Sequence, residues 1–359
     1  MTMPTRPDVA AQVRRPLDAL NFFLADVRDG LGPYLAIYLL TVQRWDEASI
    51  GVVMSIATLA GLLAQTPAGA LVDASRAKRA LVAGAALAVT IASLVLPWVP
   101  SFWPVALSQA TAHTAAAIFA PAIAAITLGT VGHAAFSHRI GRNESFNHAG
   151  NAFAAAAAGI SAFIWGPVVV FFLLAAMSVA SLFTVFAIPA NAINYDRARG
   201  LDGDTQVRRP QGKVSDRPSG LSVLITCRPL LIFAACAVLF HFANAAMPLV
   251  GQKLALQDRN SGTSLMSACI VAAQIVMVPM ALLVGAKADS WGRKPLFLGG
   301  LIILPIRGVL YTLSDDPYWL VAVPNLSDQP KSFSTMLPRT PAMSFSSSVT
   351  FQVKDPKPE

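Results

Sequence analysis

Long apolar stretches alternate with short polar ones along most of this sequence. Nine of these stretches approach the length, about 20 residues, that a helix needs to cross a hydrocarbon core about 30 Å thick. They lie near 18–40, 50–72, 80–98, 103–130, 148–165, 168–190, 227–250, 264–286 and 295–313, and a tenth begins at Tyr318. Because a helix satisfies its backbone hydrogen bonds internally, the pattern predicts an all-α, polytopic bundle of membrane helices.

The positions of lysine and arginine predict how this bundle is oriented. Basic residues gather in alternate loops, and the intervening loops hold few of them. Since short cytoplasmic loops are enriched in lysine and arginine, we expect a cytoplasmic N-terminus in a multi-pass protein of the cell (inner) membrane. The basic residues assigned to the cytoplasmic side are Arg14, Arg15, Arg76, Lys78, Arg79, Arg139, Arg142, Lys287, Arg293 and Lys294, with those between 197 and 217.

The composition supports a membrane protein and excludes several other classes. Of the 359 residues 55% are hydrophobic and 13% are charged, against about 25% charged in soluble proteins. The net charge of +8 follows the topology, so we expect no nucleic-acid partner. The three cysteines lack the spacing of a metal site, and no catalytic or nucleotide fingerprint is present. We therefore expect no metal, no cofactor and no enzyme activity.

Changes in composition divide the chain into five parts. A polar N-terminal tail, 1–16, has no cleavable signal pattern and precedes a six-helix half, 17–190. A basic stretch rich in glycine and proline, 191–220, reads as a cytoplasmic linker. An incomplete second transmembrane half, 221–323, is followed by a proline-rich tail, 324–359, which we expect to be disordered. Our hypothesis is that this tail is not native sequence, because the gene is truncated or frameshifted near residue 324.

Two of the cytoplasmic loops carry similar runs of residues. They read Gly69-Ala-Leu71-Val-Asp73-Ala-Ser-Arg76-Ala-Lys78-Arg79 and Gly285-Ala-Lys287-Ala-Asp289-Ser-Trp291-Gly292-Arg293-Lys294-Pro295. Both resemble the loop signature of major facilitator superfamily transporters, Gly-x-Leu-x-Asp-(Arg/Lys)-x-Gly-(Arg/Lys)-(Arg/Lys), which occurs once in each half of that fold. The resemblance implies a superfamily-like bundle with a complete first half and a second half of three helices and a fragment.

The resemblance also implies a role for these loops. An aspartate at the end of one helix, facing basic residues at the start of the next, can form a charge network that holds the cytoplasmic gate shut. The alternative is an exposed turn whose basic residues only set the topology. The residues that match the signature are Gly69, Asp73, Lys78 and Arg79 in the first copy, and Gly285, Asp289, Gly292, Arg293 and Lys294 in the second.

The first predicted span contains three charged residues, Asp26, Arg28 and Asp29. Each such residue at mid-helix costs about 2.5 to 3.5 kcal/mol, whereas a leucine returns about 0.3 to 0.6 kcal/mol. We therefore expect Asp26 and Asp29, which share a helix face, to point into the protein or an aqueous cavity. They either exchange a proton or cation, or form a closed ion pair with Arg28 or another basic group. Gly30, Gly32 and Pro33 are expected to loosen the helix after them.

Other polar residues pair at helical spacing within predicted spans. Histidine changes charge near physiological pH, which suits a proton relay, although a buried neutral histidine in a packed core is the competing interpretation. By analogy with the superfamily, helices one, four and seven line the central cavity, which favours the residues on those helices. The candidate residues are Gln109 and His113, His148 and Asn151, and His241 and Asn244.

The function that we predict is secondary active transport of a small solute by alternating access, coupled to protons. The expected partners are a small-molecule substrate, the proton and the lipid bilayer. Two alternatives remain open. The shortened chain is a transporter that no longer works, or the protein is a polytopic membrane enzyme that uses its aspartate and histidine residues.

Overall fold

The computed structural model describes residues 6–29, 31–199 and 262–291, with single residues and pairs between 228 and 239 and between 298 and 313. The described residues form helices and no strand, as the sequence predicts. The predicted seventh and ninth spans lie almost wholly outside these ranges. The linker beyond residue 199 and the tail 324–359 also lie outside the described residues, so their predictions remain untested.

The first predicted span is two helices, α1 (Arg6–Asp29) and α2 (Gly32–Thr41). The break follows the three charged residues, where the sequence predicts a loosened helix, and Gly32 has a φ of +42° that favours glycine. The helix α1 begins at Arg6, inside the stretch predicted to be a polar tail. Its buried face is formed by Val13, Leu17, Leu20 and Leu24, which are spaced three or four residues apart as an amphipathic helix requires.

The next two spans agree with the prediction. They are α3 (Glu47–Ala74) and α4 (Lys78–Val95). Asp46 caps the N-terminus of α3, where its carboxylate accepts a hydrogen bond from the Ser49 backbone N–H at 2.8 Å. Hydrogen bonds from the side chain and backbone of Ser49 lower the pKa of Asp46, because they stabilise the charged carboxylate.

In the region 102–165 the structure differs from the helix boundaries predicted from the sequence. This region contains α5 (Phe102–Ala116) and α6 (Phe119–Trp165), and the latter folds back at Gly132, which has a φ of +75°. The side chains of Thr127 and Asn143 are 2.8 Å apart although the residues are 16 positions apart in sequence; a straight helix would separate them by about 24 Å. The stretch 131–147, expected to be a loop, is therefore mostly helix, because its charged residues find partners inside the bundle.

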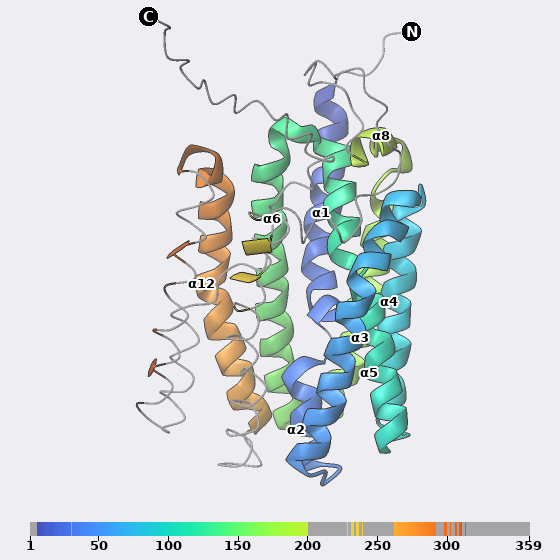
Figure 1. Cartoon of the computed structure of the whole chain (residues 1–359), viewed down its shortest axis with the longest axis vertical. Helices are drawn as coiled ribbons and strands as arrows, with labels where there is room; N and C mark the ends of the chain where they lie inside the picture. The colour runs from blue at the N-terminus through green and yellow to red at the C-terminus, as the bar shows by residue number, and fades with distance from the viewer. Residues whose placement is uncertain are drawn as a thin grey trace, which may run out of the picture.

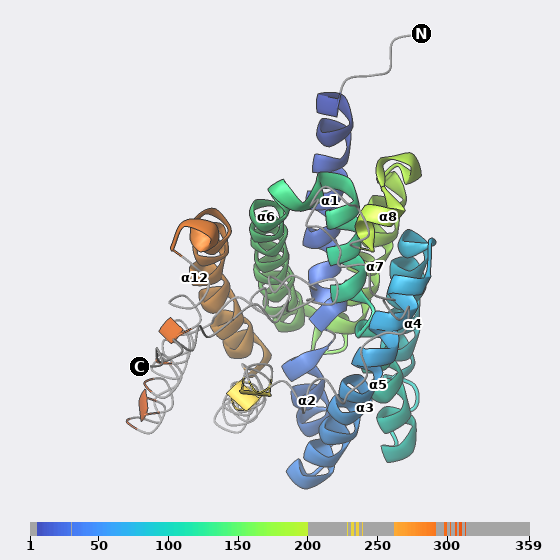
Figure 2. The same cartoon turned by 45° about the horizontal axis from the view of Figure 1, so that its top comes forward.

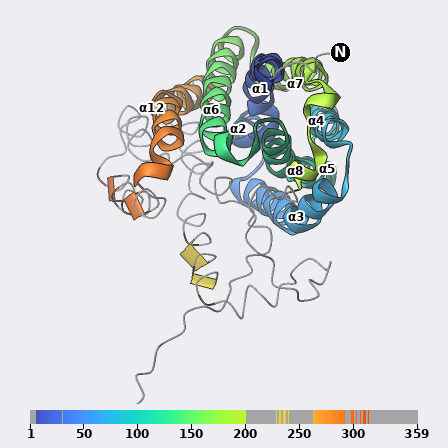
Figure 3. The same cartoon turned by 90° about the horizontal axis from the view of Figure 1, so that it is seen from above.

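The first half ends with α7 (Val169–Ala187), a short 3₁₀ turn (Ala190–Ala192) and α8 (Tyr195–Ala198). The last helix described in full is α12 (Gly262–Trp291), which matches the predicted span near 264–286. Figure 1 and Figure 2 show α12 alongside α6, and Figure 3 shows it on the far side of α6 from α4. Among the described residues, α12 therefore contacts the N-terminal half chiefly through α6.

Glycine residues set how closely these helices approach. A Cβ atom at Gly150 of α6 would overlap the backbone of Phe22 in α1, and one at Gly141 would lie 2.5 Å from the Cα atom of Gly285 in α12. Because lipid is as apolar as the side chains, membrane helices associate largely through such close packing. The helix α6 therefore connects α1 on one side with α12 on the other.

Candidate functional site

A closed charge cluster joins α1 to α6 near the N-terminal end of the bundle. The carboxylate of Asp18 accepts hydrogen bonds from Arg139 and from Arg142, each with a shortest distance of 2.7 Å. Arg139 also donates to Asn143 at 2.8 Å, and Asn143 donates to Thr127 at 2.8 Å. Short hydrogen bonds satisfy the carboxylate and the guanidinium groups of this cluster. Such charge-assisted bonds are strong, so the cluster is suited to holding α1 and α6 together.

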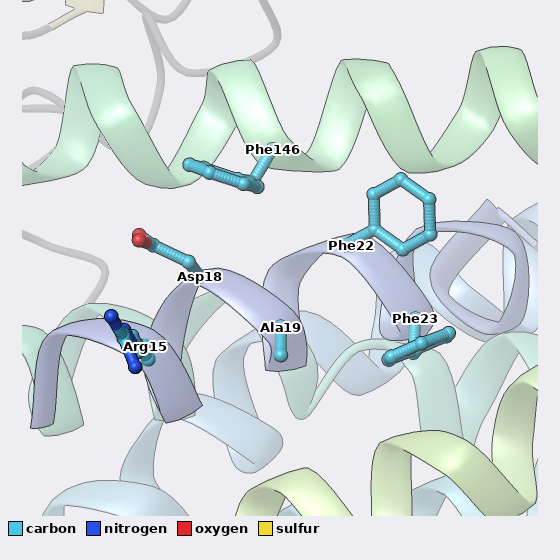
Figure 4. A pocket seen from close by; sticks show the side chains of 6 residues that line it. All are labelled: Arg15, Asp18, Ala19, Phe22, Phe23 and Phe146. Carbon is cyan, nitrogen blue, oxygen red and sulfur yellow. The ribbon is translucent and has the colours of Figure 1, made fainter.

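An open groove lies beside this cluster. Its volume is about 350 Å³, and three of the six residues that line it are phenylalanines. Figure 4 shows Asp18, Phe22 and Phe146 in the space between α1 and α6. The guanidinium of Arg142 lies 5.0 Å from the centre of the Phe146 ring, so a cation–π contact borders the groove. The residues that line it are Arg15, Asp18, Ala19, Phe22, Phe23 and Phe146.

A second ion pair joins α1 to α6 further along α1. The guanidinium of Arg28 lies 3.5 Å from one carboxylate oxygen of Glu144, and the side chains are 13% and 5% exposed. The other oxygen of Glu144 lies 3.5 Å from the amide nitrogen of Asn147. Arg28 thus pairs with a carboxylate of another helix, whereas the sequence predicted that the aspartates of the first span would supply the paired carboxylate. The distances in this pair are longer than those around Asp18.

The two other charged residues of the first span are less fully described. Asp26 is half-buried on α1 and has interaction partners. Asp29 is the last residue of α1, and the position of its side chain lies outside the described part of the structure. The prediction that these aspartates face a protein interior therefore agrees with the partial burial of Asp26 and stays a prediction for Asp29.

Polar side chains join α12 to the first half at two levels. His148 of α6, which is buried, has its Nδ1 atom 2.7 Å from Oε1 of Gln274 in α12. Since the amide oxygen can only accept, Nδ1 of His148 carries the hydrogen. At the other level the hydroxyl groups of Tyr34 in α2 and Ser267 in α12 are 3.1 Å apart. Two side-chain hydrogen bonds therefore connect α12 to the first half.

The remaining candidates lie apart from this contact between the two halves. Gln109 of α5 is buried and His113 is half-buried, and the Cβ atom of His113 lies against Gly61 in α3. Asn151 is half-buried on α6, one turn beyond His148. His241 and Asn244 lie outside the described residues. The structure thus brings His148 to α12, but it places His113 against a helix of its own half.

The first copy of the loop motif holds helix ends together within the first half. The ammonium group of Lys78, which is buried, donates to the carbonyl oxygens of Val72 at 2.7 Å and Ser75 at 3.2 Å. Arg79 donates to the carbonyl of Ile188 at 2.5 Å, just after α7. These cations satisfy carbonyl groups at helix C-termini, where the helix dipole also favours positive charge.

The other residues of the motif differ in their surroundings. Gly69 is buried on α3 and Asp73 is exposed. Gly285 belongs to α12 and makes the close contact with Gly141 of α6. Asp289 is on α12, but its side chain lies outside the described part of the structure, as do Gly292, Arg293 and Lys294. The gating role expected for the second copy is therefore untested.

Sequence reasoning missed several members of these clusters. Asp18, Glu144, Asn147 and Ser267 were not among the candidates. A signal was present, because polar residues recur at 144, 147, 148 and 151, which is the spacing of one helix face. It was overlooked because the fifth span was expected to begin at 148.

Comparisons with known proteins agree with this architecture. The sequence model of the Major Facilitator Superfamily matches residues 18–335. Two uncharacterised MFS-type transporters, from two strains of Mycobacterium tuberculosis, are each 55% identical over 316 residues, which is 88% of this chain and 74% of theirs. A crystal structure of a mutant of the nucleoside transporter NupG has a TM-score of 0.62 at 15% identity, covering 88% of this chain and 78% of that one. The last likeness shows a shared fold.

Proposed function

Because this chain belongs to the major facilitator superfamily, we propose that it is a secondary active transporter that moves a small solute by alternating access and couples this movement to protons. Membership of this family makes it a multi-pass membrane protein, and within the described residues five helical stretches are long and apolar enough to cross a membrane. The observation that carries the proposal is the set of buried polar and charged groups of α6 at its contacts with α1 on one side and with α12 on the other.

Buried acidic groups at the contact between α1 and α6 support proton coupling. The helix α6 contributes Glu144, which pairs with Arg28 of α1, and α1 also carries the half-buried Asp26. Ionisable residues inside a membrane-spanning segment are costly and commonly mark the path of a proton or ion. These residues are therefore the candidates for binding a proton or cation during the transport cycle.

The contacts between the two halves support a polar solute. His148 with Gln274, and Tyr34 with Ser267, offer hydrogen-bond donors and acceptors on both sides of the boundary. A solute with its own donors and acceptors can replace these bonds at little cost, whereas an apolar solute would leave them unsatisfied. By analogy with the family, the candidates Gln109, His113, His241 and Asn244 line the remainder of the central path.

The loop motifs are proposed to stabilise the closed cytoplasmic side. In the first copy Lys78 and Arg79 fix the ends of α3 and α7, which gives the first half a rigid edge. In the second copy Gly285 lets α12 touch α6. Asp289, Gly292, Arg293 and Lys294 would then complete the contact between the two halves.

A cytoplasmic N-terminus is part of this proposal. Arg14 and Arg15 are exposed on α1 and lie at the same end of the bundle as Arg139 and Arg142, because Asp18 joins the two regions. Reporter fusions after residue 16 and after residue 199 are expected to report a cytoplasmic location. An external location for either fusion would contradict the orientation.

The proposed transport is tested with the purified chain in proteoliposomes. An imposed pH gradient should drive accumulation of one member of a panel of labelled polar solutes, and a protonophore should abolish that accumulation. Liposomes without protein are the control for leakage. If no solute in a broad panel of sugars, amino acids, nucleosides and organic acids moves in uptake, efflux or exchange, the proposal fails.

A further inference from the structure

We infer that the open groove between α1 and α6 binds an anionic glycerophospholipid, with the phosphate at its basic end and one acyl chain against its phenylalanine rings. The occupant is a lipid of the surrounding bilayer and not a transported solute. The inference goes beyond the proposed function and is independent of transport, because it requires only that the chain spans a membrane. Figure 4 shows Arg15 on the α1 side of the groove and Phe146 on the α6 side.

The groove lies at the depth expected for lipid headgroups. A helix crosses a hydrocarbon core about 30 Å thick in about 20 residues. Counted back from Thr41, where α2 ends, this length reaches Asn21, and counted back from Trp165, where α6 ends, it reaches Ser145. Both helices therefore place the charged residues of the groove at the level of the headgroups. Its phenylalanine rings lie at the level of the first acyl carbons.

The charge around the groove favours an anion. Arg15 lines it, and Arg142 borders it with a side chain that is 29% exposed and lies over the Phe146 ring. Arg139 approaches from inside the bundle. These three guanidinium groups accompany one carboxylate, that of Asp18. Among the residues that the structure describes, Arg15 has no acidic partner, so the surroundings of the groove carry a net positive charge.

The same contacts favour an anionic lipid over a zwitterionic one. Both carboxylate oxygens of Asp18 already accept hydrogen bonds from guanidinium groups. The ammonium group of phosphatidylethanolamine would therefore find no free carboxylate among the lining residues, and it would lie beside groups of like charge. A phosphatidylglycerol headgroup brings no positive charge, and its phosphate can accept strong, charge-assisted hydrogen bonds from guanidinium groups.

An apolar surface continues from the groove along α6. The ring of Phe22 lies 5.6 Å from the ring of Phe153, measured between centres. Phe153 is exposed, as are Ile160 and Phe163 further along the helix. Phe146, Phe153 and Ile160 follow one another at seven residues, or about two helical turns, so they share one face. An acyl chain that enters the groove therefore has an apolar surface to follow toward the middle of the bilayer.

Native mass spectrometry of the purified full chain tests this inference without a transport assay. The protein is freed of lipid in detergent and titrated with phosphatidylglycerol or with phosphatidylethanolamine that carries the same acyl chains. We expect the first phosphatidylglycerol to bind about five times more tightly, which corresponds to about 1 kcal/mol, the contribution of one basic group near an anionic lipid. Equal binding of the two lipids would overturn the inference.

Arg15 and Arg14 form a matched pair for this measurement. Both are exposed on α1, but only Arg15 lines the groove. We expect Arg15→Gln to weaken binding of phosphatidylglycerol about fivefold and Arg14→Gln to change it little. Equal losses in the two variants would indicate a general attraction of lipid to a basic surface. That outcome, or an unchanged affinity in Arg15→Gln, would overturn the inference.

The change Ala19→Trp tests the apolar part of the groove without changing any charge. Ala19 is half-buried and lines the groove, so an indole ring there would occupy the space of the acyl chain. We expect binding of phosphatidylglycerol to fall about tenfold, the equivalent of about two methylene groups that are no longer buried. An unchanged affinity in the folded variant would overturn the inference. If Ala19→Trp does not fold, the comparison of Arg15→Gln with Arg14→Gln decides.

Other occupants would give different results. A large excess of inorganic phosphate should not displace phosphatidylglycerol, because the acyl chain contributes to binding; full displacement would indicate a site for a free anion and overturn the inference. A second copy of this chain in the groove would appear as a dimer that Ala19→Trp converts to a monomer, which would also overturn it. None of these measurements involves a solute, so a failure here leaves the proposed transport to its own test.

Discussion

Charged side chains inside this bundle are held by partners, and the partners explain why the chain tolerates them. Asp18 is shared by Arg139 and Arg142, and Lys78 lies against carbonyl groups at the end of α3. A buried charge without such partners would cost several kcal/mol. At the residue scale, these contacts turn residues that lipid disfavours into connections between helices.

Replacing Asp18 tests the strongest of these connections. The change Asp18→Asn leaves Arg139, which is buried, and Arg142 without their carboxylate. We expect a loss of about 3 kcal/mol in the free energy of unfolding, as for removal of one partner of a buried ion pair. Thermal unfolding in detergent, followed by circular dichroism, measures the effect. The exposed variant Glu47→Gln should be neutral, and equal stability of the two variants would contradict the structural role.

The loop between α3 and α4 offers a matched pair of basic residues. Lys78 is buried and donates to two carbonyl groups, whereas Arg76 is exposed. We expect Lys78→Met to cost about 2 kcal/mol, since hydrogen bonds from a charged donor are lost, and Arg76→Met to change stability little. Thermal unfolding of the two variants side by side checks this. A larger effect at Arg76 would argue that net charge, and not helix capping, matters here.

At the scale of helices, hydropathy located the spans well and their ends less well. The predicted boundaries of α3, α4, α7 and α12 agree with the structure within a few residues. The start of the second part of α6 was missed, since Arg139, Arg142 and Glu144 suggested a loop. Local polarity does not reveal a partner on another helix, and here those partners lie on α1.

Close helix packing gives a prediction at the same scale. A methyl group at Gly141 would lie 2.5 Å from the Cα atom of Gly285, whereas one at Gly84 of α4 would meet nothing within 4 Å. We expect Gly141→Ala to cost about 1 to 3 kcal/mol through overpacking, and Gly84→Ala to stabilise by about 0.5 to 1 kcal/mol through helix propensity. Unfolding in detergent measures both, and a neutral Gly141→Ala would contradict the close contact.

At the scale of the whole molecule, the contact between α6 and α12 joins the first half to the second. Its polar member is the hydrogen bond between His148 and Gln274. The contact also includes the close approach of the Gly141 and Gly285 backbones and a hydrogen bond from the hydroxyl of Ser145 to the carbonyl of Val278. The proposed opening of the transporter would separate these groups.

A reversible bridge across this boundary tests that movement. In a variant without native cysteines, His148→Cys with Gln274→Cys should be joined efficiently by a short bis-methanethiosulfonate reagent, which forms a disulfide with each thiol and releases sulfinate, because the parent side chains are in hydrogen-bond contact. The bridged protein should lose solute exchange and regain it on reduction. His148→Cys alone is the control. Full exchange in the bridged protein would show that the halves need not separate here.

The sequence by itself determined the class of the protein, the approximate position of most apolar spans in the first half, and the family. These follow from local properties, since the length of an apolar stretch and the spacing within a loop motif need no knowledge of neighbours. It also placed Arg28 and His148 among the functional candidates. The tertiary structure decided which groups meet: Glu144 with Arg28, Asp18 with two arginines, and His148 with Gln274. The physical reason is that a buried charge or hydrogen-bonding group is fixed by partners far away in the sequence, and only the packing of α1, α6 and α12 brings those partners together.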